Sequence, residues 1–116
     1  MKLLFVEPDR YYHAQFADHL SHLGEMKFAT TGAEAGELAR EHLPDIAVLE
    51  LLLPDVPGFE ILERLRKASP NMLMIVFSRA GHLEDVKAAL GFGVSGYFVK
   101  GQDTINDVKK LLLNII

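Results

Sequence analysis

The sequence of 116 residues contains no cysteine. Without cysteine the protein has no disulfide, no thiolate nucleophile and no cysteine ligand for zinc, so its chemistry is left to carboxylates, histidines, hydroxyls and amines. The sequence also has no apolar run approaching the ~20 residues that a membrane helix needs. Its N-terminal segment reaches the acid Glu7 too early for a signal peptide. From these absences we expect a soluble, cytoplasmic protein.

Basic residues are outnumbered, with 12 lysines and arginines against 16 aspartates and glutamates. The resulting net charge of -4 argues against nucleic acid as the direct ligand. Low-complexity tracts, linkers and internal repeats are also absent. With 49% hydrophobic residues, the length is typical of one compact globular domain over residues 1–116.

Five short apolar runs alternate with segments of helical periodicity. The runs cover residues 3–6, 26–29, 46–49, 72–77 and 97–99. The first, third and fourth runs are apolar without alternation, which is typical of parallel strands covered on both faces, whereas residues 26–29 alternate as in an edge strand. Alternating strands and helices with short connections predict an α/β fold with a single doubly wound, helix-covered parallel sheet.

The predicted helices have chemically marked starts and apolar stripes. Thr31 followed by Glu34 is typical of a capping box, Thr104 followed by Asp107 is a weaker one, and Pro57 suits the first turn of the third helix. Apolar side chains recur at helical spacing in the first and last helices, which predicts one buried face on each. These stripes are Phe16, Leu20 and Leu23, and Ile105, Val108, Leu112 and Ile115.

Polar residues follow the predicted strands at their carboxyl ends. In a doubly wound sheet these ends meet at one edge, where such folds carry their functional groups. The residues that should gather there are Glu7, Pro8, Asp9, Glu50, Ser78 and Lys100.

The order of these residues resembles the receiver domains of two-component response regulators. The segment 7–9 is similar to that family's acid pair, and Glu50 with Pro54 and Gly58 is similar to its phosphoacceptor loop. The resemblance implies a flavodoxin-like (βα)5 fold with strand order 2-1-3-4-5. It also implies a non-enzymatic module of two-component or phosphorelay signal transduction.

Three further positions extend the resemblance. Ser78, Tyr97 and Lys100 are similar to the family's switch and phosphate-contacting residues. The resemblance implies a protein partner, either a histidine kinase or a downstream effector. Docking is expected through the fourth helix, fifth strand and fifth helix, here about residues 83–90, Tyr97 and residues 104–115, and the same face is a candidate for homodimer contacts.

Two departures from the family pattern concern magnesium and phosphate. The family holds Mg²⁺ with one acid of the pair, the acceptor aspartate and a backbone carbonyl that corresponds to Leu52. Pro8 offers no side-chain oxygen, and Glu50 extends its carboxylate about one bond length beyond an aspartate, where a misplacement of ~1 Å is felt strongly in rate. A site formed by Glu7, Glu50 and the Leu52 carbonyl is therefore expected to bind Mg²⁺ weakly or not at all, and no cofactor is expected.

Arg79 and Gly101 are further departures. Arg79 follows Ser78 where the family usually has a small residue, and we hypothesise that Arg79 and Lys100 neutralise the acidic pocket of Glu7, Asp9 and Glu50 in place of a metal. Gly101 replaces a proline that the family commonly has in a cis peptide, so a cis bond is not expected here.

The leading interpretation is a pseudo-receiver that acts by protein docking with little or no phosphorylation. The alternative keeps phosphoryl transfer, with Glu50 as acceptor and Mg²⁺ held by Glu7 and Asp9. A third possibility is a Mg²⁺-dependent phosphatase or flavin-binding protein on the same fold. Against it, the loop over residues 7–12 is acidic and bulky, and no Gly-x-Gly-x-x-Gly motif follows the first strand.

Overall fold

The computed structural model describes residues 1–116 as alternating strands and helices. The strands are β1 (Lys2–Val6), β2 (Glu25–Ala29), β3 (Ile46–Leu49), β4 (Leu73–Ser78) and β5 (Gly96–Val99), and the helices are α1 (Arg10–Leu20), η1 (Ser21–Leu23, a 3-10 turn), α2 (Gly32–His42), α3 (Gly58–Ala68), α4 (Leu83–Gly91) and α5 (Ile105–Ile115). All strand pairs are parallel, and the sheet order is β2-β1-β3-β4-β5. The predicted doubly wound fold and strand order are confirmed.

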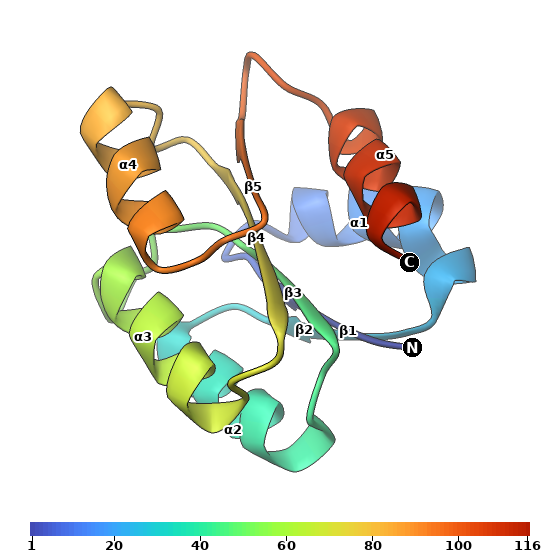
Figure 1. Ribbon diagram of the computed structural model, residues 1–116. Coiled ribbons are helices and arrows are strands. Elements are labelled where there is room, and N and C mark those ends of the chain that lie inside the picture. The colour runs from blue at the N-terminus through green and yellow to red at the C-terminus, as the bar shows by residue number, and fades with distance from the viewer.

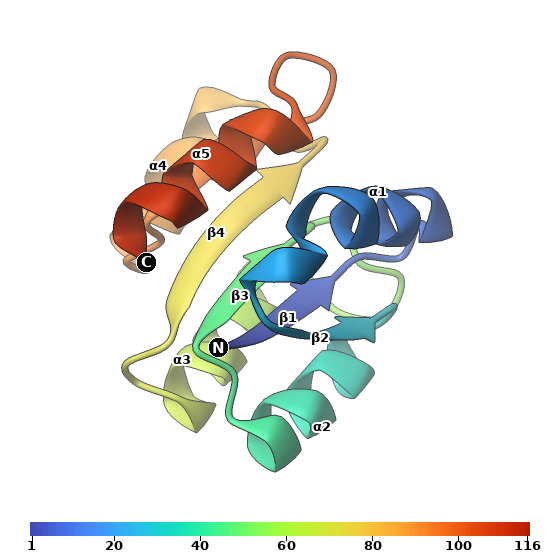
Figure 2. The same ribbon diagram turned by 90° about the vertical axis from the view of Figure 1, so that its right-hand side faces the viewer.

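Helices cover both faces of the sheet (Figure 1). The helices α2, α3 and α4 lie on one face, and α1 and α5 lie on the other. Figure 2 shows α1 and α5 next to each other on their shared face. Because every crossover passes through a helix, all five strands point the same way and deliver their carboxyl ends to one edge.

The alternation of side chains along β1 divides the core into two layers. Leu4 and Val6 pack into the layer under α2, α3 and α4, while Leu3 and Phe5 pack into the layer under α1 and α5. The second layer is rich in aromatic rings: Phe5 stacks on Phe16 of α1 with ring centroids 4.5 Å apart. β3 is buried at all four positions, as its continuous apolar run predicts.

Both predicted capping boxes mark helix starts, with one change of partner. The Glu34 N–H donates to Thr31 Oγ1 over 3.1 Å, but the Glu34 carboxylate accepts from the N–H of Thr30, one residue before the cap. At α5, Asp107 Oδ2 accepts from the Thr104 N–H at 2.8 Å, and Pro57 is the N-cap of α3. The Thr31 contact satisfies a first-turn N–H of α2 that otherwise lacks a partner, and the acids at Glu34 and Asp107 bond main-chain N–H groups just before their helices.

The predicted apolar stripes hold except at their ends. Leu23 lies beyond α1, in η1, and is partly buried against the aromatic layer. Ile115 is 37% exposed, so its predicted burial is wrong; the last turn of α5 is less covered than the turns that carry Ile105, Val108 and Leu112. None of the helices combines the length and apolar character that crossing a bilayer requires.

Candidate functional site

Four polar side chains meet at the carboxyl edge of the sheet. Glu7 follows β1, Glu50 follows β3, Ser78 ends β4, and Lys100 follows β5. Glu7, Glu50 and Ser78 are 2%, 4% and 0% exposed, and the side chain of Lys100 is 4% exposed. Buried charges persist in proteins only when they are paired and hydrogen bonded, so this cluster must satisfy its own polar atoms.

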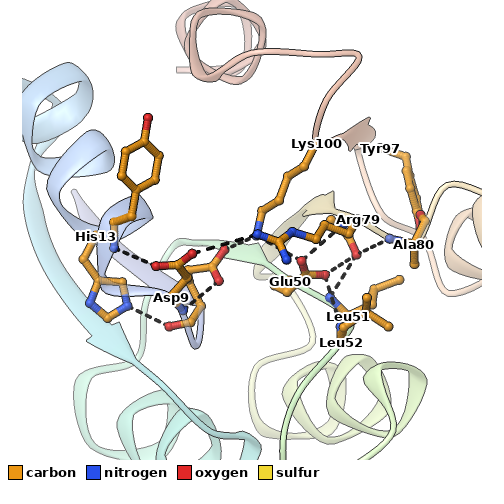
Figure 3. A network of polar contacts seen from close by, with 12 residues as sticks. Asp9, His13, Glu50, Leu51, Leu52, Arg79, Ala80, Tyr97 and Lys100 are labelled. Carbon is orange, nitrogen blue, oxygen red and sulfur yellow. Dashed lines mark hydrogen bonds and ion pairs between the residues drawn. The ribbon is translucent and has the colours of Figure 1, made fainter.

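The ammonium of Lys100 lies between the two carboxylates (Figure 3). It donates to Glu50 Oε1 over 2.9 Å and also to Glu7 Oε1. One cation is therefore shared by two buried carboxyl groups. This is the ion pair that strand-end placement of Lys100 predicts.

The carboxylate of Glu50 accepts four hydrogen bonds. Its Oε1 accepts from Lys100 and from the Arg79 main-chain N–H at 3.2 Å, while Oε2 accepts from the Ser78 hydroxyl and the Leu52 N–H at 3.1 Å. Burial is the largest single influence on its pKa and acts to raise it. The donors, led by Ser78 and Leu52, outweigh burial, so the pKa of Glu50 lies below its usual value and the group is ionised at neutral pH.

The influences on the pKa of Glu7 have the opposite net effect to those on Glu50. Burial raises its pKa above the usual value, and the hydrogen bonds from Lys100 and from the Asp9 N–H, 3.0 Å from Oε2, offset only part of this effect. The nearby charge of Glu50 adds to the rise. Two carboxylates that share one ammonium thus differ in proton affinity, because one has four donors and the other has two.

Ser78 and Tyr97 connect the acid pocket to the loop after β4. The Ser78 hydroxyl oxygen accepts from the Ala80 N–H at 3.0 Å and donates to Glu50. The Tyr97 hydroxyl donates to the Ala80 carbonyl, so Tyr97 touches this loop and not the carboxylates. Desolvation is the main reason that the pKa of Tyr97 is raised to about 12, with the charges of Asp85 and Glu50 adding to it.

Arg79 lies at the rim, away from the two buried carboxylates. Its guanidinium is 4.0 Å from Asp9 Oδ2, and these side chains are 65% and 46% exposed. Of the three acids that Arg79 and Lys100 were expected to neutralise together, Arg79 pairs only with Asp9 and Lys100 pairs with Glu7 and Glu50. The expected bridge from the Arg79 guanidinium to Glu7 or Glu50 is not formed, and only the Arg79 main-chain N–H reaches Glu50. The physical reason is that Lys100 already occupies the space between the carboxylates, and burying a second cation would add a large desolvation penalty.

Asp9 has a local structural task. Its Oδ1 accepts from the Tyr11 N–H at 2.9 Å and caps the N-terminus of α1. Its main-chain N–H donates to Glu7, and the His13 Nε2 donates to the Glu7 carbonyl oxygen over 2.7 Å. The turn between β1 and α1 is therefore fixed around Glu7.

These residues do not form a good magnesium site. A pocket of about 140 Å³ is lined by Glu7, Pro8, Asp9, Glu50, Leu52, Arg79 and Lys100. Magnesium requires near-octahedral oxygen coordination. Here Pro8 supplies no oxygen, Asp9 caps a helix, and the carboxylates of Glu7 and Glu50 are bound to an ammonium; no group of three or more acidic or histidine side chains is arranged to hold a metal.

Tyr12 is a member of the site that the sequence interpretation missed. Its ring centroid lies 4.0 Å from the Lys100 Nζ, and the Phe77 ring lies 5.7 Å away. The only signal in the sequence was a tyrosine three positions after an acid that caps a helix.

At the end of β5, the chain leaves through Gly101 with φ of 92°, a conformation that favours glycine, and the chain contains no cis peptide.

Sequence comparisons identify related proteins. The profile of the response regulator receiver domain matches residues 5–112. The nitrate/nitrite response regulator protein NarL of Escherichia coli K12 is 37% identical over 83 residues, which cover 72% of this chain and 38% of NarL. The transcriptional regulatory protein CusR of Escherichia coli K12 is 31% identical over 101 residues, covering 86% and 44%. The chain thus spans less than half the length of these relatives.

Solved structures show the same fold. A CheY-like response regulator receiver domain protein of Methanospirillum hungatei JF-1 superimposes with a TM-score of 0.87 at 24% identity, covering 98% of this chain and 92% of that one. The non-phosphorylated HemR receiver domain of Leptospira biflexa gives 0.89 at 22% identity with the same coverage. The similarity extends over nearly the whole chain.

Proposed function

Because the chain belongs to the response regulator receiver family, we propose that it is a two-component signalling module whose acid pocket holds fixed charge and accepts phosphoryl groups poorly or not at all. The observation that carries this proposal is the state of Glu50, the residue at the phosphoacceptor position. All four of its acceptor positions are filled by donors. In this proposal residues 1–116 act as one receiver unit.

Nucleophilic attack needs a free oxygen lone pair, and an ionised carboxylate has about four acceptor sites in total. In Glu50 these sites are taken by Lys100, Ser78 and the main-chain N–H groups of Leu52 and Arg79. Attack on a phosphoryl group would require at least one donor to leave, inside a buried pocket where an unpaired donor costs about 1–3 kcal/mol. The longer side chain adds misalignment to this barrier.

The poor fit to magnesium supports the same proposal. A metal would have to displace the Lys100 ammonium from Glu7 and Glu50 before it could polarise a phosphoryl group, and Pro8 would give it no further ligand. The Lys100 ammonium therefore takes over the charge compensation. The negative charge of Glu50 beside Ser78 is present without any phosphoryl transfer.

The output is proposed to be contact with a protein partner, a histidine kinase or a downstream effector, through α4, β5 and α5. Three leucines on the two helices support this surface: Leu83 and Leu90 of α4 are 66% and 53% exposed, and Leu113 of α5 is 53% exposed. Tyr97 of β5 links this surface to the acid pocket through the Ala80 carbonyl, one hydrogen bond away from Ser78.

Incubation with Mg²⁺ and acetyl phosphate, followed by intact-mass measurement, tests the proposal. We expect the mass of the native protein to stay unchanged. A matched variant with Pro8→Asp and Glu50→Asp introduces aspartates at the two positions where the family pattern has them, and it is expected to gain phosphate under the same conditions. A gain of one phosphate by the native protein that disappears in Glu50→Ala would overturn the proposal in favour of phosphoryl transfer to Glu50.

A further inference from the structure

We infer that Tyr12 is the positioning residue of the site: its ring face receives the third hydrogen of the Lys100 ammonium and holds that cation between Glu7 and Glu50. This inference rests on the proposed function and deepens it, because it explains why Lys100 has no donor left for a phosphoryl oxygen or another anion. Tyr12 does not touch the carboxylates; it acts through Lys100.

The hydrogen-bond inventory of Lys100 leads to this assignment. An ammonium has three donors and no acceptor. Two of the donors go to Glu7 and Glu50, and no buried side-chain nitrogen or oxygen in the protein lacks a partner. Two aromatic rings face Nζ, and the centroid of Tyr12 at 4.0 Å is nearer than that of Phe77 at 5.7 Å, so we assign the third hydrogen to Tyr12. A desolvated cation over a tyrosine face is a favourable contact, because the ring quadrupole attracts the positive charge.

The Tyr12 ring is itself held in place by other aromatic rings. It meets Phe77 of β4 edge to face, at 5.7 Å and 87°, and it lies 6.5 Å from Phe16 of the aromatic core layer. The Asp9 cap fixes where α1 begins and so fixes the direction of Tyr12 in its first turn. A ring fixed from the core can hold a flexible lysine in one position.

Lys100 borders two spaces, and Tyr12 lines one of them. One is the acid pocket, and the other is a cleft of about 230 Å³ between α1 and the start of α5. Tyr12 and Lys100 line this cleft together with Gln15, His19 and Asp103. If the ring is removed, the ammonium gains room on the cleft side, and Glu7 and Glu50 lose part of their compensation.

Nuclear magnetic resonance tests the contact directly. In the native protein the ring current of Tyr12 is expected to shift the ε-methylene protons of Lys100 upfield, with Lys100→Met used for assignment. The shift should persist in Tyr12→Phe, because the Tyr12 hydroxyl plays no part in the contact, and it should be lost in Tyr12→Leu. Tyr11→Leu removes an exposed ring that meets Tyr12 edge to face at 5.2 Å, while the rings facing Lys100 Nζ are those of Tyr12 and Phe77. It serves as the control, with the shift retained.

Chemical labelling gives a second readout. Acylation of Lys100 by an amine-reactive reagent, quantified by peptide mass spectrometry, is expected to rise roughly tenfold or more in Tyr12→Leu and to stay at the native level in Tyr12→Phe and Tyr11→Leu. Other lysines in the same digest provide the internal standard.

An unshifted Lys100 in the native protein, or equal Lys100 labelling in native protein and a folded Tyr12→Leu, would overturn the inference. If Tyr12→Leu does not fold, the native shift and its retention in Tyr12→Phe still decide the question. These readouts do not involve phosphate. If native Glu50 is phosphorylated and the ring-current shift of Lys100 is present, the proposed function alone is refuted. If the native protein shows neither phosphorylation nor a shifted Lys100, the role of Tyr12 alone is refuted.

Discussion

Glu7 and Glu50 share one ammonium, but the number of donors around each carboxylate sets them apart. Glu50 accepts from four groups and its pKa is lowered, whereas Glu7 accepts from two and its pKa is raised by burial. A buried ion pair need not add to the stability of a protein, because the desolvation of both charges opposes their attraction. Removing one partner lowers the stability strongly, since it leaves the other charge buried and uncompensated.

Glu50→Gln is therefore expected to destabilise the protein by about 3 kcal/mol at pH 7. The amide nitrogen would face either the Ser78 hydroxyl and the Leu52 N–H or the Lys100 ammonium and the Arg79 N–H, and all of these groups are donors. Because the pKa of Glu50 is lowered on folding, its charge contributes stability above the usual value of 4.5, and this contribution is lost as the pH falls through the folded pKa. The difference in free energy of unfolding between the native protein and Glu50→Gln should therefore narrow as the pH falls through that range.

Urea unfolding across this pH range measures the effect. Glu60→Gln is the control, because Glu60 forms an exposed pair with Arg64 at 2.7 Å, and such pairs on a helix contribute about 0.3–0.5 kcal/mol. Equal stability of native protein and Glu50→Gln at pH 7 would show that the four hydrogen bonds to Glu50 contribute little.

At the scale of the elements, loops tie the helices to the edge that carries the site. The loop after β3 reaches across to α2, where Asp55 accepts from the N–H of Gly32 at 2.8 Å and of Ala33 at 3.0 Å. These two hydrogen bonds hold the pKa of Asp55 below its usual value. The same loop begins at Glu50, so the cap on α2 also helps to fix the acid pocket.

Asp55→Ala is expected to lower the stability of the protein at pH 7, because it leaves two N–H groups of α2 without a protein partner. The pKa of Asp55 is lowered on folding, so its contribution is present above the usual value of 3.8 and disappears as the pH falls through the folded pKa. Thermal unfolding of native and variant protein at neutral and acidic pH should show a gap that closes in acid. A gap that does not depend on pH would contradict the role of its charge.

Gly58 at the start of α3 shows how tightly this loop is packed. A Cβ at Gly58 would lie 2.2 Å from the Leu51 carbonyl oxygen and 2.6 Å from the Leu51 Cα. Gly58→Ala is expected to destabilise the protein by about 2 kcal/mol, since the backbone beside Glu50 must move. Gly91→Ala, at the end of α4 with nothing within 4 Å, is the matched control and should be neutral or slightly stabilising in the same urea unfolding assay.

The elements themselves were readable from the sequence, because apolar runs and caps are local signals. The edge strand β2, the buried strand β3 and the start of α5 follow from alternation, continuous burial and the Thr104–Asp107 pair. The exposure of Ile115 could not be predicted from the sequence. Periodicity shows which face of α5 is apolar, but not how far along the helix the rest of the protein covers that face.

At the scale of the whole molecule, the parallel sheet brings together residues that are up to 93 positions apart in sequence. Strand-end placement predicted that Glu7, Glu50, Ser78 and Lys100 would meet, and these side chains are in contact. The directions of longer side chains depend on tertiary packing, so neither the outward turn of Arg79 nor the ring of Tyr12 over Lys100 could be predicted.

The same architecture separates the pocket from the surface proposed for docking. Lys100 and Ser78 are buried at the edge of the sheet, and the exposed leucines of α4 and α5 lie on the helices outside it. Tyr97 lies between the two regions through its bond to Ala80. A fixed charge in the pocket would therefore hold one arrangement of this surface, whereas a phosphorylated pocket would switch between two.

In the proposed function the ammonium of Lys100 takes the place of a divalent cation between Glu7 and Glu50. A high-resolution crystal structure from crystals grown with excess Mn²⁺, whose anomalous scattering marks its position, distinguishes the two cations. We expect the Lys100 Nζ between Glu7 and Glu50 and no anomalous peak in the pocket. An anomalous peak at coordination distance from Glu7 and Glu50 oxygens, with Lys100 displaced, would contradict this proposal.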